Sequence, residues 1–188
     1  GHVHLAAANS QVNQGQVTGY EVGTGHIAAH GKLNLRGTDY AALIAKAVQI
    51  NDEIYAGRQL DVILGENSVH LQDGDFTQLT AINKQTSTSS ANQTTNKEQQ
   101  GATPTLALDI SNLGGMYAGK IHLIGTDKGF GVNNAGVITA TGKGVQVGTG
   151  TLTLDAQGNL INTGKILAKD AVTINTHGST TQNNGTLL

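Results

Sequence analysis

Histidine and carboxylate side chains are the groups of this chain that could bind a metal ion or transfer protons. His2 and His4 alternate, so on a strand they would share one face and could form a two-histidine metal site. His122 stands between Ile121 and Leu123, which predicts that it points away from the core. The seven histidines are scattered, at positions 2, 4, 26, 30, 70, 122 and 177. We therefore assign no catalytic residue, no cofactor-binding residue and no metal ligand.

A glycan-cleaving enzyme would need two carboxylates held at a fixed separation. Asp52-Glu53 is the one adjacent pair among 13 acidic residues, and neighbours on a strand face opposite sides. The aromatic platforms that sugars favour are scarce, because the chain has 2 Phe, 4 Tyr and no Trp. A glycan-active enzyme is thus the weakest functional hypothesis, and we expect no enzymatic activity.

Five short motifs suggest chemistry, and each has a simpler interpretation. Asp73-Gly74-Asp75 could suggest calcium, but the spacing of an EF-hand does not follow and such pairs are typical of turns. The Gly-rich stretch 125–131 lacks the Gly-Lys-Ser/Thr of a phosphate loop. Arg36-Gly37-Thr38-Asp39 is not the tripeptide that integrins bind. Asn92-Gln93-Thr94 and Asn184-Gly185-Thr186 fit the glycosylation triplet, which occurs by chance in a chain this rich in Asn and Thr.

Composition excludes several classes of protein. The 188 residues include no Cys, which rules out a disulfide scaffold, a thiolate nucleophile and Cys-ligated zinc. The net charge of −2 argues against a dedicated nucleic-acid binder. No apolar run approaches the length of a membrane span.

Short alternations of apolar residues predict strands. In each of them two apolar residues flank one other residue, so both apolar side chains lie on one face. Turn-forming Gly, Asn, Asp and Thr separate the pairs, and Gly alone supplies 26 residues. The pairs are Val3/Leu5, Leu33/Leu35, Val48/Ile50, Leu60/Val62, Ile121/Leu123, Val145/Val147, Leu152/Leu154 and Val172/Ile174.

A weak repeat in the last third of the chain indicates a solenoid. Its copies are Asn134-Ala135-Gly136-Val137-Ile138, Asn162-Thr163-Gly164-Lys165-Ile166 and Asn184-Gly185-Thr186-Leu187. The equivalent glycines are 28 and 21 residues apart, a period that suits one turn-rich coil. We predict an all-β, parallel β-helix whose corner asparagines stack and join their amides from coil to coil.

Residues 73–104 interrupt this pattern and predict a polar, flexible insertion outside the β-helix. The run from Gln85 to Gln100 has almost no apolar side chain, so it cannot bury a face. A hairpin at its base would use Phe76, Leu79 and Ile82. The insertion is either a solvated loop or a binding surface. The remaining residues suffice for about seven coils.

Residues 39–47 allow two interpretations. The stretch Ala41-Ala42-Leu43-Ile44-Ala45-Lys46-Ala47 favours a helix by local propensity, with Asp39 as its N-cap. Only about two helical turns fit before Val48-Gln49-Ile50. We therefore predict a coil of the β-helix, with a short helix as the alternative.

Two segments resemble filamentous haemagglutinin-type exoproteins. They are residues 40–64, from Tyr-Ala-Ala-Leu-Ile-Ala-Lys-Ala to Leu-Asp-Val-Ile-Leu, and residues 107–136, from Ala-Leu-Asp-Ile-Ser-Asn to Gly-Val-Asn-Asn-Ala-Gly. The start of the chain is similar to the later half of the family's secretion domain. Residues 137–188 resemble the first repeats beyond it. The Asn-Pro-Asn motifs of the early half are absent, so the chain resembles an internal fragment.

The resemblance implies a fold, a route and partners. It implies a single right-handed parallel β-helix over residues 1–188, exported by two-partner secretion through the periplasm to the bacterial cell surface. The implied partner is the outer-membrane transporter, through its periplasmic domains. We expect a structural and adhesive module that contributes to transporter recognition and to a rigid shaft. The alternative is the stalk of a contact-dependent inhibition toxin-delivery protein that binds a receptor on neighbouring cells. The second partner to expect is therefore a host or bacterial cell-surface receptor.

Overall fold

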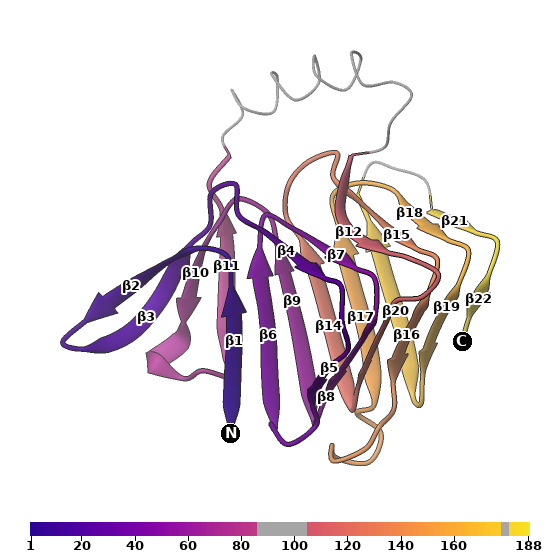
Figure 1. The fold of residues 1–188 in the computed structure, drawn as a ribbon, viewed down its shortest axis with the longest axis horizontal. Coiled ribbons are helices and arrows are strands. Elements are labelled where there is room, and N and C mark those ends of the chain that lie inside the picture. The colour runs from indigo at the N-terminus through magenta and orange to yellow at the C-terminus, as the bar shows by residue number, and fades with distance from the viewer. Residues whose placement is uncertain (86–104, 178–180) are drawn as a thin grey trace.

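The fold is a β-helix built from three parallel sheets, with a fourth, antiparallel sheet beside it (Figure 1). The computed structural model describes residues 1–85, 105–177 and 181–188. Within them each parallel sheet has six strands, and the chain visits the three sheets in turn as it winds. The three parallel sheets agree with the predicted parallel β-helix.

The first sheet runs β1 (His2–Ala6), β6 (Tyr40–Ala45), β9 (Gln59–Leu64), β14 (Lys120–Gly125), β17 (Thr151–Ala156) and β20 (Ala171–Thr176). The second runs β4 (His26–Ala29), β7 (Ala47–Ile50), β12 (Leu106–Ile110), β15 (Gly131–Asn134), β18 (Leu160–Asn162) and β21 (Thr181–Asn183). The third runs β5 (Leu33–Leu35), β8 (Glu53–Ala56), β13 (Gly115–Ala118), β16 (Val137–Ala140), β19 (Lys165–Ala168) and β22 (Thr186–Leu187). The antiparallel sheet holds β2 (Asn9–Asn13), β3 (Gln16–Glu21), β10 (Asn67–Leu71) and β11 (Leu79–Asn83), with the short 3-10 helix η1 (Gln72–Gly74) between β10 and β11.

Apolar side chains stack in columns along the axis of the β-helix. Parallel pairing keeps the register from coil to coil, so that each inward residue covers an inward residue of the coil before it. Such a column removes apolar surface from water at every coil, which stabilises the stack. One column in the first sheet consists of Leu5, Leu43, Val62, Leu123, Leu154 and Ile174.

The asparagine corners form the predicted ladder. Asn134 donates through Nδ2 to Asn162 Oδ1 at 2.9 Å, and Asn162 donates to Asn183 Oδ1 at 2.8 Å. The first two side chains are fully buried. The third member of the repeat is therefore Asn183 and not Asn184, because it is Asn183 that pairs with Asn162.

Two sequence predictions about the coils are wrong. Val145 and Val147 lie in the loop between β16 and β17, where Val147 is 97% exposed. The described coils also give six strands to each parallel sheet instead of about seven. The missing coil is explained by β2, β3, β10 and β11, which leave the β-helix to form the antiparallel sheet.

Residues 40–45 form strand β6, as predicted, and the helical alternative is wrong. All six side chains of this strand are buried, because the core covers one face and the antiparallel sheet covers the other. A strand buried on both faces has a continuous apolar sequence, which resembles a short helix in local propensity. This is why the sequence alone left two interpretations open.

A second, smaller core lies between the first sheet and the antiparallel sheet. Tyr40, Ala42, Ile44 and Ile63 from the first sheet pack there with Tyr20, Val22, Val69 and Leu71. Phe76 and Leu79 join this core, whereas Ile82 is 63% exposed and does not. The polar run from Gln85 onward, Pro104 and the triplet at Asn92 lie outside the described residues, apart from Gln85 itself.

Candidate functional site

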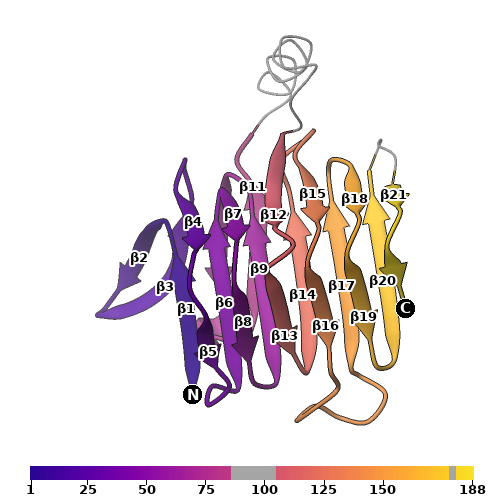
Figure 2. The ribbon, with the colours of Figure 1, turned by 45° about the vertical axis from the view of Figure 1, so that its right-hand side comes forward.

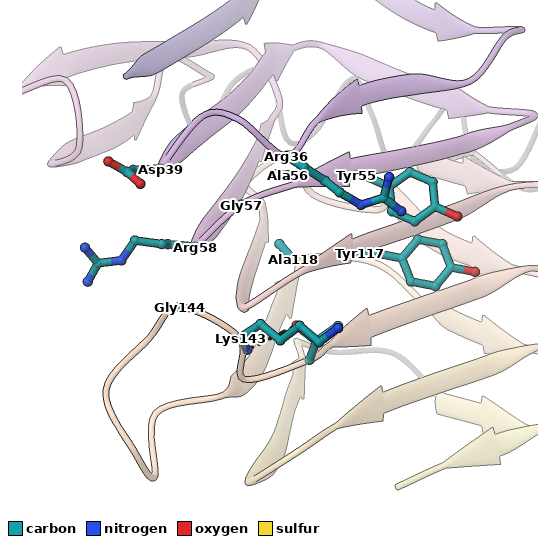
Figure 3. A pocket seen from close by; sticks show the side chains of 11 residues that line it. Arg36, Asp39, Tyr55, Ala56, Gly57, Arg58, Tyr117, Ala118, Lys143 and Gly144 are labelled. Carbon is teal, nitrogen blue, oxygen red and sulfur yellow. Dashed lines mark hydrogen bonds between the residues drawn. The ribbon is translucent and has the colours of Figure 1, made fainter.

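A pocket opens at the corner where the chain passes from the third sheet to the first (Figure 3). Its volume is 440 Å³. We call it the basic pocket and define it by Arg36, Asp39, Tyr55, Arg58, Tyr117 and Lys143, which lie on successive coils. Three cationic side chains and one carboxylate line it, so it is suited to a ligand with negative charge.

Two tyrosines form one wall of the basic pocket. Tyr55 of β8 and Tyr117 of β13 pair in register, and their rings stack with centroids 4.8 Å apart at 15°. The Arg36 guanidinium lies 3.7 Å from the centroid of the Tyr55 ring, as a cation–π contact. The Tyr55 hydroxyl donates to Glu53 Oε2 at 2.9 Å. Burial raises the pKa of Tyr117, with Glu53 and Tyr55 adding to the effect, so this phenol stays neutral.

The cations of the basic pocket are exposed and lack carboxylate partners. Arg36, Arg58 and Lys143 are all exposed, and within the described ranges none of them has an ion pair. Asp39, the one carboxylate of the lining, lies 3.8 Å from the amino group of Gly1. In Figure 3, Arg58 and Asp39 stand at one side of the pocket and the tyrosines at the other. The pocket therefore combines flat aromatic surface with uncompensated positive charge.

The antiparallel sheet is the second candidate surface, and it ends at a free edge. Its order is β11-β10-β3-β2, so β2 has a hydrogen-bonded neighbour on one side only. Every residue of β2 is exposed, and Val12 is 60% exposed. The β2–β3 hairpin protrudes from the β-helix in two views (Figures 1 and 2). Such an edge offers unpaired backbone donors and acceptors to another strand.

This hairpin was not among the predicted elements, although the sequence carries a local signal for it. The turn between β2 and β3 has positive φ at Gln14 and Gly15, 53° and 77°, as the two-residue turns of hairpins require. Asn13-Gln14-Gly15 between two polar strands is that signal. It was hard to recognise because neither strand has an alternating apolar face.

A histidine network links the first sheet to the antiparallel sheet. His4 Nδ1 lies 2.7 Å from the Tyr20 hydroxyl, and His4 Nε2 lies 2.8 Å from the Phe76 carbonyl oxygen. Nε2 must donate to the carbonyl oxygen; in the neutral ring, which burial favours, Nδ1 then accepts from the Tyr20 hydroxyl. Burial lowers the pKa of His4, against the opposing effect of the Phe76 hydrogen bond. His4 is therefore a structural residue here.

A buried ion pair secures the other side of the antiparallel sheet. Lys46 Nζ lies 2.6 Å from Asp127 Oδ2, and the Lys46 side chain is 15% exposed while that of Asp127 is 0% exposed. Asp127 also accepts from the Glu66 amide at 3.1 Å and from Asn83 Nδ2 at 2.7 Å. Lys46 also lies 4.0 Å from the Phe130 ring centroid. The network joins β10 and β11 to the coils.

The structure places the remaining sequence motifs in turns and on surfaces. His122 is half-buried between two buried neighbours, so it points outward as predicted. Asp73 has φ of 55° in η1, and Asp75 accepts from the Thr77 amide, which makes this stretch a turn. Asp52 accepts from the Glu53 amide. His2 lies with His4 on the Tyr40 side of β1.

Across residues 1–85, 105–177 and 181–188, no three His, Asp or Glu side chains gather where they could hold a metal ion. None of the helical segments in the same ranges is long and apolar enough to cross a membrane.

Comparison with known proteins decides the family. A family model described as "TPS secretion domain" matches residues 1–160. The chain belongs to this family. As a TPS secretion domain, it is a segment of a two-partner-secretion exoprotein, which crosses the periplasm to the bacterial cell surface. The predicted resemblance to haemagglutinin-type exoproteins is thereby confirmed.

Relatives and a solved structure agree with this assignment. The chain is 38% identical over 184 residues to "Toxin CdiA" of Yersinia pestis, covering 97% of this chain and 5% of that protein. It is 36% identical over 151 residues to "tRNA nuclease CdiA-2" of Burkholderia pseudomallei, covering 80% of this chain and 4% of that protein. The chain thus spans about one-twentieth of the length of these relatives. The crystal structure of a filamentous hemagglutinin secretion domain has a similar fold, with a TM-score of 0.63 at 18% identity, over 98% of this chain and 58% of that one.

Proposed function

We propose that this TPS secretion domain is recognised by the periplasmic domains of its outer-membrane transporter and that it contributes coils to a rigid shaft. It acts by binding and by architecture and not by catalysis. The observation that carries the proposal is the β2–β3 hairpin, whose free edge stands away from a β-helix of the TPS family.

The hairpin is suited to strand addition. An extended segment of a partner can join an exposed edge through backbone hydrogen bonds, which do not depend on a particular sequence. Here β2 is the edge strand, and β3 on its other side is anchored to β10 through Glu21, Tyr20 and Gly19. Because β2 and β3 are neighbours in sequence, they can pair before the coils are complete.

The shaft role follows from the stacking of the coils. Inward columns of Leu, Val and Ile and the buried asparagine ladder repeat along the axis. Each coil packs on its neighbours, so rigidity extends as coils are added. We also propose that the haemagglutinin-type repeats begin at residue 137.

The test is a calorimetric titration of the chain with the periplasmic domains of the cognate transporter. We expect a Kd of about 1 μM for the unchanged chain. Replacing residues 12–18 with Asn-Gly shortens the hairpin, preserves the pairing of Gln11 with Gly19 and keeps the buried Tyr20 and Val22; affinity should fall about tenfold or more. The control is Val147→Ser in an exposed loop, which should bind as before.

Two outcomes would contradict the proposal at different points. If the folded chain does not bind the periplasmic domains of the transporter, this segment does not carry the recognition role. If the chain with the shortened hairpin binds the transporter as tightly as the unchanged chain, the β2 edge is not the binding element. Circular dichroism and thermal melting of each variant separate a loss of binding from a loss of folding.

A second candidate function is favoured by the relatives named CdiA. We infer that the segment is the secretion domain of a contact-dependent inhibition toxin-delivery protein. Deleting this segment from the full-length exoprotein should leave the protein inside the producing cell and abolish inhibition of neighbouring cells in co-culture. Surface display without the segment would contradict both functions.

A further inference from the structure

The β2–β3 hairpin is attached to the rest of the antiparallel sheet through three consecutive residues of β3. Gly19, Tyr20 and Glu21 each oppose a residue of β10, and these three pairs make up the register between the two strands. The same three residues pair with β2 on their other side. Within the described ranges, residues 12–18 have no register partner on β10. The hairpin thus projects beyond a short attachment, and we call Gly19, Tyr20 and Glu21 the hairpin clamp.

Tyr20 fixes the hairpin clamp to the first sheet. Its side chain is buried in the second core, on the face of the antiparallel sheet that covers β6. The Tyr20 hydroxyl lies 2.7 Å from His4 Nδ1 on β1, and His4 Nε2 lies 2.8 Å from the Phe76 carbonyl oxygen. A buried polar network in which each group has a partner makes the surrounding structure rigid. This network therefore holds β3 against the β-helix.

Glu21 fixes the hairpin clamp on the opposite face. Neighbouring residues of a strand point to opposite sides, so Glu21 faces away from the core that holds Tyr20. Its two carboxylate oxygens lie 2.8 and 3.0 Å from the Ser68 hydroxyl, and Lys84 Nζ lies 3.4 Å from one of them. Hydrogen bonds to an ionised group are roughly twice as strong as those between neutral groups. The clamp is thus held from both faces of the sheet.

Gly19 allows β3 to approach β10 closely at the point where the attachment ends. A Cβ at this position would lie 2.2 Å from the Val69 carbonyl oxygen, which is a backbone atom within a paired strand. A side chain here would therefore push β3 away from β10. By contrast, a Cβ at Gly23, two residues beyond the clamp, meets nothing within 4 Å. The close approach is a property of the clamp position.

We propose that the hairpin clamp sets the direction in which the free β2 edge stands, and that its members are positioning residues for recognition by the transporter. The inference rests on the proposed function, in which the transporter adds a strand to β2. An added strand meets the edge in one orientation, and an edge already held in that orientation loses less conformational freedom on binding. A hairpin that swings about residues 19–21 offers the same edge with lower affinity.

The direction of the hairpin can be measured without the transporter. The chain contains no Cys, so two introduced cysteines carry spin labels at the chosen places only. Val12→Cys places one label on the exposed β2, and Leu113→Cys places the other in an exposed turn between β12 and β13. Electron–electron double resonance then gives the distribution of distances between the labels. We expect one narrow distribution when the clamp is unchanged.

Two variants loosen the clamp in different ways. Tyr20→Phe with Glu21→Ala removes the hydrogen bonds on both faces and leaves an aromatic ring in the core, whereas Gly19→Ala separates β3 from β10. Each should broaden the distance distribution and lower the affinity for the periplasmic domains of the transporter about fivefold or more. Glu21→Gln keeps an acceptor for the Ser68 hydroxyl, so it should keep both the narrow distribution and the affinity. Circular dichroism confirms that each variant retains the β-helix.

Matched controls lie outside the clamp. Tyr55→Phe with Glu53→Ala removes the same atoms from the third sheet, where the Tyr55 hydroxyl donates to Glu53. Gly23→Ala is the control for Gly19→Ala. Both controls should keep the narrow distribution and should change the affinity less than about twofold.

A disulfide separates a loss of position from a loss of side chains. Glu21 and Ser68 are directly opposed on antiparallel strands, whose Cα atoms are about 4.5–5.5 Å apart, within the span of a disulfide. We combine Tyr20→Phe, Glu21→Cys and Ser68→Cys in one chain. Its oxidised form should bind the transporter nearly as tightly as the unchanged chain, and its reduced form about fivefold or more weakly. The reductant has no bond to break in the unchanged chain, which lacks Cys.

Three outcomes would overturn the inference. A narrow distribution in both loosened variants would mean that the clamp does not hold the hairpin. A broad distribution with unchanged affinity would mean that the direction of the edge does not matter to the transporter. Equal binding by the oxidised and reduced forms of the disulfide chain would exclude a positioning role.

Failure of the proposed function has a different signature. If the chain with the shortened hairpin binds as tightly as the unchanged chain, the β2 edge is not the binding element, and the positioning role fails with it. The label distances still decide in that case whether the clamp holds the hairpin, because they do not depend on the transporter.

Discussion

Lys46 Nζ and Asp127 Oδ2 form a buried ion pair at 2.6 Å although the two residues are 81 positions apart in the chain. Lys46 comes directly before β7, and Asp127 follows β14. The pair lies where β10 and β11 leave the coils, and it is shielded from water. Its position makes it an anchor of the antiparallel sheet on the β-helix.

Removing one partner of this pair should be costly. Lys46→Met leaves the Asp127 carboxylate buried without its cation, and we expect a loss of about 3 kcal/mol in the free energy of unfolding. Lys84→Met breaks the more exposed pair with Glu21 at 3.4 Å and should cost less than about 1 kcal/mol. Urea unfolding of both variants measures the difference. If both variants lose the same unfolding free energy, burial does not make the Lys46–Asp127 pair more stabilising than an exposed pair.

The asparagine ladder should depend on its middle member. Asn162 accepts from Asn134 and donates to Asn183 and to the Thr186 carbonyl. Asn162→Ala leaves buried groups without partners, so unfolding free energy should fall by about 2–3 kcal/mol.

The control for the ladder is an asparagine outside the core. Asn133 is half-buried and donates to Asp109 at 2.9 Å. Asn133→Ala should cost less than about 1 kcal/mol, because water can replace that partner. If the two substitutions destabilise the chain equally, the ladder does not stabilise the stack in the way that its geometry indicates.

The corner glycines should not tolerate a side chain. A Cβ at Gly164 would collide with the carbonyl oxygen of Gly136 on the preceding coil, so Gly164→Ala should cost about 1–3 kcal/mol or more. A Cβ at Gly37 meets nothing within 4 Å, and Gly37→Ala should stay within about 0.5 kcal/mol of the unchanged chain. Thermal and urea melts check both. A neutral Gly164→Ala would mean that the coils can separate at this corner without loss.

Acid should weaken the packing of the antiparallel sheet through His4. Burial holds the pKa of His4 below its ordinary value of 6.5, so the unfolded chain binds a proton that the folded chain resists. The contribution of neutral His4 is therefore complete above pH 6.5 and is lost as the pH falls below that value toward the folded pKa.

Urea unfolding at pH 7.5 and pH 5.5 measures this effect. The unchanged chain should lose stability between the two values, and His4→Gln should lose less. The carboxyl groups of Glu21 and Asp75 also have lowered pKa values, because of hydrogen bonds to Ser68 and Thr77 respectively, but their contribution is lost at lower pH, below the ordinary values of 4.5 and 3.8. An unchanged pH dependence in His4→Gln would assign the effect to other groups.

Local patterns in the sequence were sufficient for the β-helix itself. Alternating pairs such as Leu60/Val62 and Leu152/Leu154 set which side chains face inward, and an Asn two residues before a Gly marks each corner of the last coils. These signals depend on neighbours within a few residues, because side chains alternate along a strand and a sharp corner needs particular backbone angles. The one failed pair, Val145/Val147, shows that alternation without a register partner does not make a strand.

The tertiary structure alone decided which residues meet across coils. The sequence by itself determined the parallel β-helix, its inward columns and its corner asparagines. Only the fold placed His4 against Tyr20 and Phe76, stacked Tyr55 on Tyr117 and paired Lys120 with Gln59. The physical reason is that the coils differ in length, since β10 and β11 leave the β-helix between Arg58 and Lys120, so the register between coils comes from strand pairing and not from a fixed spacing in the chain.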